Sequence, residues 1–391
     1  MKFEPSLKMS IFEPAIFADL KAAAEAKKAT GAETVDLSLG SPDLPPDEKV
    51  RRVLAEQSAQ ATTYGYTLGG TKRFHEAVAS YYKRRSGVTL NPETEIIQTM
   101  GSQEGLVHLP LAFCNEGDIV LTTNPAYVAY EAGIKLAGAV PYEMPLRAEN
   151  GFLPDLDAIP EDVAQQAKIL ILNLPGNPVP AIPDAQFFDK VVAFARKHNI
   201  LVLHDAAYSE YYFAGDSPIS FLSTPGAKEV GVEINSLSKS FSLAGARIAY
   251  IVGNAEVIRI FKELKSNLDF GTFGPIQEAA VTALDHAEEI TDRLRQEFSA
   301  RHHVLMNGLT EIGWSAAPSN GGMFVWAKYP FQMDDKEFVF KAIEHCGVVM
   351  VPGSIFGTEG KGYVRLALIQ SVEELQKAVE HLSKLEVFIK A

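Results

Sequence analysis

The chain of 391 residues is 47% hydrophobic and 22% charged, an ordinary globular composition that excludes a collagen, a coiled coil and wholesale disorder. Its length suffices for two to three domains, or for one large unit with a sizeable core. Lys and Arg number 36 against 49 Asp and Glu, a formal net charge of −13, so general binding to nucleic acid or to an anionic membrane is not expected. The net charge does not exclude a local basic pocket that binds a small anion.

Cys114 and Cys346 are the two cysteines, and the sequence has neither a C-x-x-C pair nor a Cys/His cluster. We therefore expect no metal site and no disulfide framework. Two free thiols suit a reducing compartment. The N-terminus lacks the apolar segment of a secretory signal, and no stretch approaches the ~18 apolar residues of a membrane span. We expect a cytoplasmic protein.

The first predicted element is an alanine-rich helix over residues 15–30, ended by Gly31. Further along, short apolar runs are predicted as strands buried on both faces, at 119–121, 169–172, 201–203, 230–234 and 248–252. Residues 184–198 have helical spacing, with Asp184 as N-cap and Asn199 as stop. Strand, helix and strand in this order predict a right-handed crossover and a mostly parallel sheet.

Ligands of such a sheet bind at the carboxyl ends of its strands, so polar residues that follow the strands are the first candidates for a site. An amide, a carboxylate, a phenol, hydroxyls and a lysine follow successive strands, and Gly101 with Ser102 precedes a helix that begins near Gln103. The residues that follow strands are Asn177, Asp205, Tyr208, Ser236, Ser238 and Lys239. Their convergence on one rim is more informative than any one of them.

Taken singly, each candidate has an ordinary explanation, such as a solvated lysine, a capping serine or a buried salt bridge. The functional alternative makes Lys239 a Schiff-base lysine and Asp205 the acid that keeps a pyridine nitrogen protonated. Tyr208 is either a core residue or a hydrogen-bond partner of a phenolic oxygen. Residues 101–105 predict an anion site at a helix N-terminus, and Arg247 is placed to pair with the same anion.

These demands belong together in one cofactor, pyridoxal 5′-phosphate. It needs a lysine for its aldehyde, an acid for its ring nitrogen, donors for its ring oxygen and an anion site for its phosphate. It also needs a flat side chain against its ring, which Tyr127 can supply by stacking.

The order and spacing of these residues resemble, essentially end to end, the class I and class II pyridoxal-phosphate aminotransferases of fold type I. Residues 39–43 are similar to the N-terminal substrate loop of that family, and residues 362–367 to its C-terminal carboxylate-binding motif. Within the family, the phrases at 151–157, 204–210 and 225–230 are similar to the branch of LL-diaminopimelate and alanine aminotransferases.

The resemblance implies a role for each matching residue. Lys239 would be the Schiff base and proton shuttle, Asp205 would pair with the ring nitrogen, and Asn177 and Tyr208 would bind the ring oxygen. Tyr127 would stack on the ring. The phosphate would be surrounded by Ser102, Gln103, Ser236, Ser238 and Arg247.

The resemblance also implies a substrate site. Arg365 would bind the α-carboxylate of the substrate, next to Gly40 and Asn177. Tyr64 resembles a tyrosine that reaches the phosphate of the partner subunit, and Tyr66 is the competing choice because the loop length does not align cleanly. The family forms homodimers with active sites at the interface, so we expect a homodimer.

Two departures from the family pattern stand out. Val179 and Pro180 replace the usual threonine and glycine after Asn177 and Pro178, which changes the freedom of that turn. Ala246 replaces an aromatic residue, and we expect it to open space near the cofactor. The sequence offers no obvious second arginine to bind the side-chain carboxylate of a substrate. It therefore does not predict a preference for aspartate as substrate.

The implied architecture is α/β, with a large domain built on a mostly parallel seven-stranded sheet and a smaller α/β domain. We expect an N-terminal arm and part of the small domain at 1–49, the large cofactor-binding domain at 50–285 and the C-terminal small domain at 286–391. In the last, residues 337–344 and 373–385 are predicted as helices around a strand at 347–351.

The predicted function is transfer of an amino group between an L-amino acid and a 2-oxo acid by a ping-pong mechanism, with alanine, glutamate and diaminopimelate all open as substrates. One alternative is a carbon–sulfur β-lyase on the same fold, because the same lysine and aspartate serve both chemistries. The other is a non-catalytic regulator that binds the cofactor. The acidic charge, the lack of an appended DNA-binding domain and the presence of both Lys239 and Arg365 argue against it.

Overall fold

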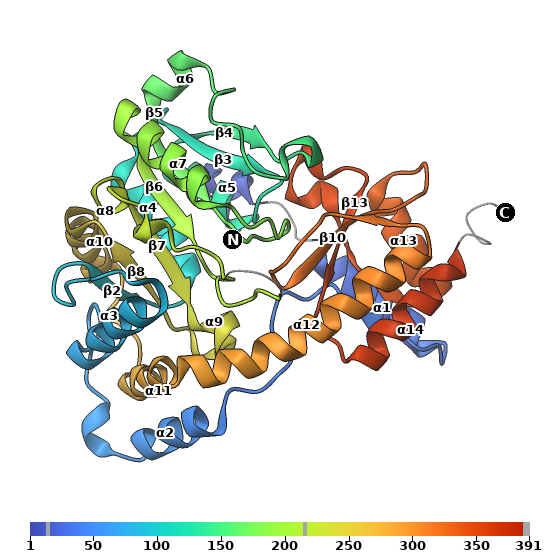
Figure 1. Ribbon diagram of the computed structural model, residues 1–391, viewed down its shortest axis with the longest axis horizontal. Helices are drawn as coiled ribbons and strands as arrows, with labels where there is room; N and C mark the ends of the chain where they lie inside the picture. The colour runs from blue at the N-terminus through green and yellow to red at the C-terminus, as the bar shows by residue number, and fades with distance from the viewer. Residues whose placement is uncertain (13–15, 214–216, 386–391) are drawn as a thin grey trace.

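The computed structural model describes residues 1–391 except 13–15, 214–216 and 386–391. A seven-stranded sheet, the central sheet below, forms the middle of the larger lobe, on the left in Figure 1. The strands stand in the order β2 (Ile96–Thr99), β8 (Ala249–Gly253), β7 (Gly231–Ser236), β6 (Leu201–Asp205), β5 (Ala167–Leu172), β3 (Ile119–Asn124) and β4 (Val140–Pro145). Only β8 runs antiparallel to its neighbours, so the predicted mostly parallel sheet is confirmed.

The sheet is buried on both faces, as the apolar runs predicted. Successive residues of β5 alternate between two core clusters: Leu170 and Leu172 belong to one, Ile169 and Ile171 to the other. One face is covered by α3 (Lys72–Ser86), α7 (Ala185–His198) and α11 (Gly274–Asp285), and the other by α4 (Ser102–Phe113), α5 (Ala129–Leu136) and α10 (Ala255–Leu268). Side chains of a strand point alternately to opposite faces, so both helical layers bury apolar surface on the same strands.

Helix α7 has the bounds that its sequence predicts. The Asp184 carboxylate accepts a hydrogen bond from the backbone N–H of Phe187 at 2.8 Å and so caps the first turn. The apolar side is buried, including Phe188 and Val191. Asn199, with φ of 55°, ends the helix in the left-handed region.

Two smaller sheets lie beside the central one. One is antiparallel, in the order β12 (Val351–Pro352), β13 (Tyr363–Ala367), β10 (Phe324–Lys328) and β9 (Ser315–Ala316). The other is the parallel pair of β1 (Val35–Asp36) and β11 (Val348–Val349). They share a third core cluster with α1 (Phe17–Ala29), α12 (Ala287–Glu311), α13 (Asp335–Cys346) and α14 (Val372–Ser383). The N-terminal segment therefore folds with the C-terminal third of the chain.

Three sequence predictions need correction here. The single strand expected at 347–351 is two strands, because β11 pairs with β1 whereas β12 pairs with β13. The helix expected to reach Leu385 ends at Ser383. The helix expected over 15–30 is α1, whose described part begins at Phe17, and Ala15 lies outside the described residues.

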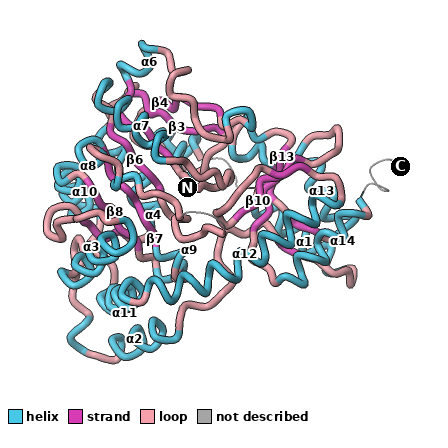
Figure 2. The backbone as a smooth tube through the Cα atoms, viewed as in Figure 1, coloured by secondary structure: helices cyan, strands magenta, loops and turns pink. Residues whose placement is uncertain are grey.

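Helix α12 is 25 residues long and runs past both the central sheet and the smaller sheets (Figure 2). Its Ile290 belongs to the core cluster of the large sheet, whereas Leu294, Phe298 and Leu305 belong to the cluster of the smaller sheets. One continuous helix thus packs into two cores. The remaining helices are α2 (Glu48–Ser58), α6 (Glu161–Gln166), α8 (Ala227–Val230) and α9 (Leu237–Ser240).

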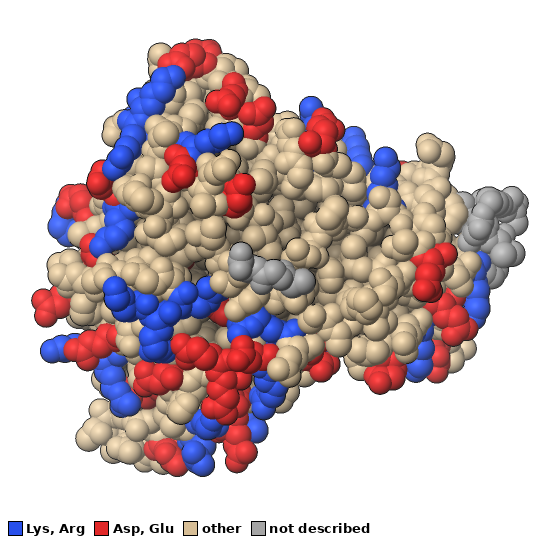
Figure 3. Space-filling view, in the orientation of Figure 1, with Lys and Arg blue, Asp and Glu red and all other residues tan. Residues whose placement is uncertain are grey.

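Acidic and basic side chains are interspersed over α2, α3 and α12 on the face shown in Figure 3. Lys49 of α2 pairs with Glu289, and Arg84 of α3 pairs with Glu288, both on α12. Exposed pairs of this kind contribute little to stability. Among the described helices, none combines the length and the apolar character needed to cross a membrane.

The contribution of the Asp184 N-cap of α7 to the stability of the fold can be tested. Replacement of Asp184 by Ala removes the acceptor of the Phe187 N–H, and we expect the free energy of unfolding to fall by about 0.5–2 kcal/mol. Asp184→Asn keeps an equivalent acceptor and should retain the stability of the parent. Urea unfolding of the three proteins measures this, and equal stability of the Ala and Asn variants would show that the cap is unimportant.

Candidate active site

A cavity of about 480 Å³ opens where the carboxyl ends of the parallel strands meet the N-terminal segment and β13. Every residue predicted for the site except Tyr64 lines it: Gly40, Ser102, Gln103, Tyr127, Asn177, Asp205, Tyr208, Ser236, Ser238, Lys239, Arg247 and Arg365. The sheet topology explains this convergence. Strands β5, β6 and β7 run in parallel, so the loops that follow them emerge side by side.

The turn before α4 brings backbone close to a positive charge. Gly101 has φ of 86°, and a Cβ at this position would overlap the guanidinium of Arg247. Only glycine allows this close approach without strain. The first residues of α4, Ser102 and Gln103, therefore face the cavity beside Arg247. A helix N-terminus, a hydroxyl and a guanidinium together suit a phosphate.

Asp205 lies at the end of β6 with only 4% of its surface exposed. Burial raises the pKa of its carboxyl, because a buried charge is poorly solvated. Two hydrogen bonds oppose this effect: Tyr130 donates its hydroxyl to Oδ2 at 2.8 Å, and Ala207 donates its N–H to Oδ1 at 3.2 Å. The carboxylate therefore stays available to hold a proton on a partner in the cavity.

Lys239 lies in α9, directly after β7, and its Nζ donates to the carbonyl oxygen of Gly40. Burial, together with the charges of Arg365 and Arg247, lowers the pKa of Lys239 to about 8, and Asp205 acts in the opposite direction. A lysine in this range is partly neutral at physiological pH. A neutral amine is a nucleophile and a base, whereas an ammonium is neither.

Arg365 of β13 is 3% exposed. It donates from one terminal nitrogen to Oδ1 of Asn177 at 2.8 Å and from the other to the carbonyl of Ser38 at 2.6 Å. Its Nε is buried and has no hydrogen-bond partner among the described residues. Burial lowers the pKa of the guanidinium to about 10. A buried, charged donor without a partner is costly, so this nitrogen calls for an anionic acceptor from outside the chain.

Two buried tyrosines lie near the cavity, and only Tyr208 lines it. Tyr208 is buried, packs edge-on against Phe324 and has its pKa raised by burial. Tyr211 lies deeper and donates its hydroxyl to the carbonyl of Lys239 at 2.9 Å. Tyr208 thus presents a protonated phenol to the cavity, and Tyr211 fixes the backbone that carries the lysine.

The residues present fit pyridoxal phosphate. Lys239 offers a partly neutral amine, Asp205 a buried acid, Tyr127 a flat ring, and α4 with Arg247 an anion site. Arg365, with an unpaired Nε, remains free for a second anion. Among the described residues that line the cavity, Lys239, Arg247 and Arg365 are basic and Asp205 alone is acidic, so this lining favours anionic ligands.

Sequence reasoning assigned no role to Asn173, which ties two of the predicted residues together. Its side-chain nitrogen donates to the carbonyl of Asp205 at 2.7 Å, and its side-chain oxygen accepts from the N–H of Asn177 at 2.8 Å. The only signal for it in the sequence is its position directly after the apolar run of β5.

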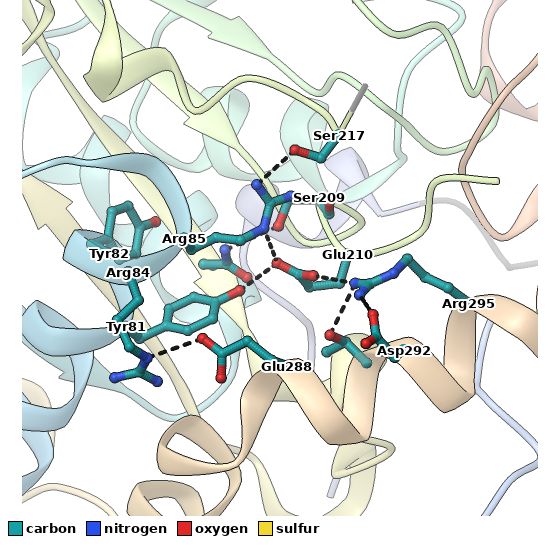
Figure 4. Close-up of polar contacts among 12 residues, drawn as sticks. Tyr81, Tyr82, Arg84, Arg85, Ser209, Glu210, Ser217, Glu288, Asp292 and Arg295 are labelled. Carbon is teal, nitrogen blue, oxygen red and sulfur yellow. Dashed lines mark hydrogen bonds and ion pairs between the residues drawn. The ribbon is translucent and has the colours of Figure 1, made fainter. Parts of the chain in front are cut away.

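Glu210 was also missed, and Figure 4 shows why it matters. Its buried carboxylate accepts from the Tyr81 hydroxyl at 2.5 Å, from Arg85 at 2.8 Å and from Arg295 at 2.9 Å. These partners lie on α3 and α12, so the network fixes the loop that carries Tyr208 to both helices. No local pattern indicates such contacts, because the partners are distant in the sequence.

Three sequence expectations have mixed outcomes. Tyr64 and Tyr66 are 64% and 84% exposed and lie outside the cavity of their own chain. Ala246 packs against the core and is not among the lining residues of the cavity, whereas Ala244 is, and the expected opening near the cofactor stays a prediction. Asn177 keeps its place in the cavity despite the altered turn that follows it.

Comparison with known proteins agrees with the geometry. The sequence model of the family described as "Aminotransferase class I and II" matches residues 32–382. The chain is 39% identical to an LL-diaminopimelate aminotransferase of Aquifex aeolicus, over 98% of this chain and all of that protein. It is 40% identical to another from Moorella thermoacetica, over 95% of each.

Solved structures give the same picture. Substrate-bound BacF from Bacillus subtilis superposes with a TM-score of 0.94 at 38% identity, over 98% of both chains. A probable N-succinyldiaminopimelate aminotransferase of Thermus thermophilus superposes with a TM-score of 0.91 at 36% identity, over 95% of this chain and all of that one.

The fold and the cavity define a fold type I enzyme that depends on pyridoxal phosphate. The chain belongs to the family of class I and class II aminotransferases, and it is an enzyme that transfers amino groups. The resemblance stated from the sequence, including the likeness to LL-diaminopimelate aminotransferases, is confirmed. The lyase alternative is not favoured by these comparisons.

The lowered pKa of Lys239 can be measured on the protein after removal of the cofactor. Because its pKa is about 8, half of the Lys239 side chains should be neutral at pH 8 and about a tenth at pH 7. Acetylation of the Lys239 peptide, followed by mass spectrometry across a pH series, should therefore show a midpoint near 8. Exposed lysines in the same digest serve as the internal reference.

The variant Arg365→Met removes one of the positive charges that lower this pKa. We expect its acetylation midpoint to move upward. A parent midpoint near the ordinary lysine value of about 10.4 would contradict the electrostatics described here.

Proposed function

We propose that amino-group transfer takes place in the cavity described above, with Lys239 as the residue that carries the cofactor and moves the proton. One observation carries this proposal: Lys239 is the lysine of the cavity, and its pKa is lowered to about 8. The amino donor is an L-amino acid and the acceptor a 2-oxo acid, which use the same site in turn, as in ping-pong kinetics.

When bound, pyridoxal phosphate supplies an aldehyde for the amino group and a conjugated ring that takes up electrons. The chain supplies position and proton transfer. Arg365, which lines the cavity, binds the α-carboxylate of the substrate and fixes the orientation of the Cα–H bond. Nζ of Lys239 takes the proton from Cα and returns a proton in the reverse half-reaction.

The remaining residues hold the ring system. Asp205 keeps a proton on the ring nitrogen, while Asn177 and Tyr208 bind the ring oxygen. Tyr127 stacks on the ring face. Ser102, Gln103, Ser236, Ser238 and Arg247 surround the phosphate, and Gly40 borders the substrate. Preorganised donors of this kind lower the barrier because they need not reorganise during the reaction.

For the substrate, we propose LL-diaminopimelate as the first amino donor to test, because the relatives compared above carry that name. L-Alanine and L-glutamate remain the alternatives. Among the described lining residues, Arg247 and Arg365 are the only arginines, and both already have assigned anions. A dedicated partner for an aspartate side chain is therefore lacking in this part of the chain.

We propose that the enzyme is a cytoplasmic homodimer. Both cysteines are free thiols, as suits a reducing compartment. Tyr64 packs on Phe273 and Tyr66 on Phe270, at ring distances of 5.1 and 5.0 Å, yet all four rings are more than one-third exposed. Contiguous exposed apolar rings of this kind are typical of an interface.

We also propose the domain division expected from the sequence, with residues 50–285 as the cofactor-binding domain and residues 286–391, joined by 1–49, as the smaller one. Pairing of β1 with β11 supports the grouping of the N-terminal segment with the C-terminal part. The start of α12 at Ala287 supports the boundary between them.

The function is tested by the absorbance of the purified enzyme during titration with each amino donor. The parent should bleach with a donor and recover its band with a 2-oxo acid. Lys239→Ala should lose most turnover, because the described lining residues include no other amine that could move the Cα proton. The exposed Lys262 is the matched control, and Lys262→Ala should keep parental activity. Transamination by Lys239→Ala at the parental rate would refute the assignment.

Shared active sites can be tested by mixing two impaired variants. If Tyr64 binds the phosphate of the partner, Tyr64→Phe and Lys239→Ala should each be impaired alone. Mixed dimers should regain about a quarter of parental activity, because half of the random dimers contain one intact site. Tyr66→Phe is the comparison, and failure of both tyrosine variants to complement would refute a shared site.

A further inference from the structure

Tyr130 is a buried tyrosine next to the site, but it does not line the cavity. It lies in the first turn of α5, is 1% exposed and packs in the core cluster that covers one face of the central sheet. Its hydroxyl donates to Oδ2 of Asp205 at 2.8 Å. The proposed function assigns no role in the reaction to this residue, although its hydroxyl contacts the acid of the site directly.

The hydrogen bond from Tyr130, at 2.8 Å, is shorter than the other hydrogen bond found for the Asp205 carboxylate among the described residues. Burial raises the pKa of Asp205, and this bond is the strongest influence against it, ahead of the Ala207 N–H and of the charges of His204 and Lys239. The other oxygen of Asp205 accepts only the longer bond from Ala207, at 3.2 Å. An uncompensated buried carboxylate takes up a proton, so the Tyr130 hydroxyl counts heavily here.

Tyr130 also packs against Tyr127, the residue proposed to stack on the cofactor ring. Its ring meets that of Tyr127 edge-on, with 5.7 Å between centroids and 85° between planes. The backbone N–H of Tyr130 donates to the carbonyl of Tyr127 at 3.0 Å. An edge-to-face contact fixes the tilt of the half-buried Tyr127 ring as well as its position. One buried side chain therefore contacts both the acid and the flat ring.

We propose that Tyr130 is a positioning residue for the cofactor ring: its hydroxyl keeps Asp205 as the ionised acceptor of the ring N–H, and its own ring sets the face that Tyr127 presents. This inference rests on the proposed function, in which Asp205 and Tyr127 contact the cofactor. Asp205 remains the partner of the ring N–H, and its charge state is controlled by Tyr130, which does not line the cavity.

Loss of the hydroxyl has a defined consequence. Without it, the Asp205 carboxylate loses a donor, and the proton shared between Asp205 and the ring nitrogen moves toward the carboxylate. The ring nitrogen then carries less positive charge and withdraws electrons less strongly. Proton removal from the substrate Cα becomes slower, whereas Arg365 still binds the α-carboxylate as before.

The test uses the holoenzyme reconstituted with pyridoxal phosphate that is ¹⁵N-labelled in the ring. In Tyr130→Phe, the ring nitrogen resonance should move toward that of an unprotonated pyridine. The value of kcat should fall by roughly tenfold, the effect of removing one hydrogen bond to a charged group, while KM for the amino donor changes by less than about twofold. The Phe ring keeps the edge contact, so the fold should be retained.

Tyr82→Phe is the matched control. Tyr82 is 2% exposed and donates its hydroxyl to a buried carboxylate, that of Glu233, at 2.7 Å, but neither residue lines the active-site cavity. Both variants should lower the melting temperature, since each leaves a buried carboxylate with one donor fewer. Only Tyr130→Phe should move the nitrogen resonance.

A double variant makes the test independent of activity and of stability. In an Asp205→Asn background, addition of Tyr130→Phe should leave the nitrogen resonance where Asp205→Asn alone puts it. An unmoved resonance in Tyr130→Phe alone, or an equal shift in both backgrounds, would overturn this inference. Failure of the proposed function is distinguishable, because then Lys239→Ala would remain active.

Discussion

The described lining of the cavity holds three cationic side chains and one carboxylate, and most of the site follows from this imbalance of charge. Lys239, Arg247 and Arg365 line the cavity, and Asp205 is the only acid among the lining residues that the structure describes. Burial lowers the pKa values of both Lys239 and Arg365, and the charges of Arg365 and Arg247 lower the pKa of Lys239 further. Anionic ligands relieve this repulsion, since a phosphate and a carboxylate replace missing counter-charges. The electrostatics that make the lysine reactive therefore also select the cofactor and the substrate.

The cations of the cavity donate mainly to neutral acceptors such as backbone carbonyls. These acceptors satisfy the N–H groups but leave the positive charge in place. Ser38 and Gly40 offer carbonyl oxygens to Arg365 and Lys239. A carboxylate at either position would neutralise the cation and remove the demand for a ligand. Outside the cavity, by contrast, the Glu210 carboxylate neutralises Arg85 and Arg295. These ion pairs fix the loop that carries Tyr208 and create no demand for a ligand.

Much of the sheet and more than half of the described cavity lining could be predicted from the sequence, for a physical reason. Parallel strands are buried on both faces and read as apolar runs, and their carboxyl ends share one edge, so Asn177, Asp205 and Lys239 could be placed together. Asn173 and Glu210 could not, because their roles depend on partners that only the tertiary fold supplies. The split at 347–351 was hidden for the same reason: both halves are apolar, and only β1 and β13 decide their pairing.

The hydrogen bond between Arg365 and Ser38 joins residues 327 positions apart, and β1 joins β11 over a similar span. Contacts of such sequence separation form late, because the entropy of closing a long loop must be overcome before they stabilise anything. The parallel sheet can assemble from nearer neighbours first. During biosynthesis, the strand ends would thus exist as a half-built cleft, which becomes competent to hold a substrate only when the two ends of the polypeptide meet.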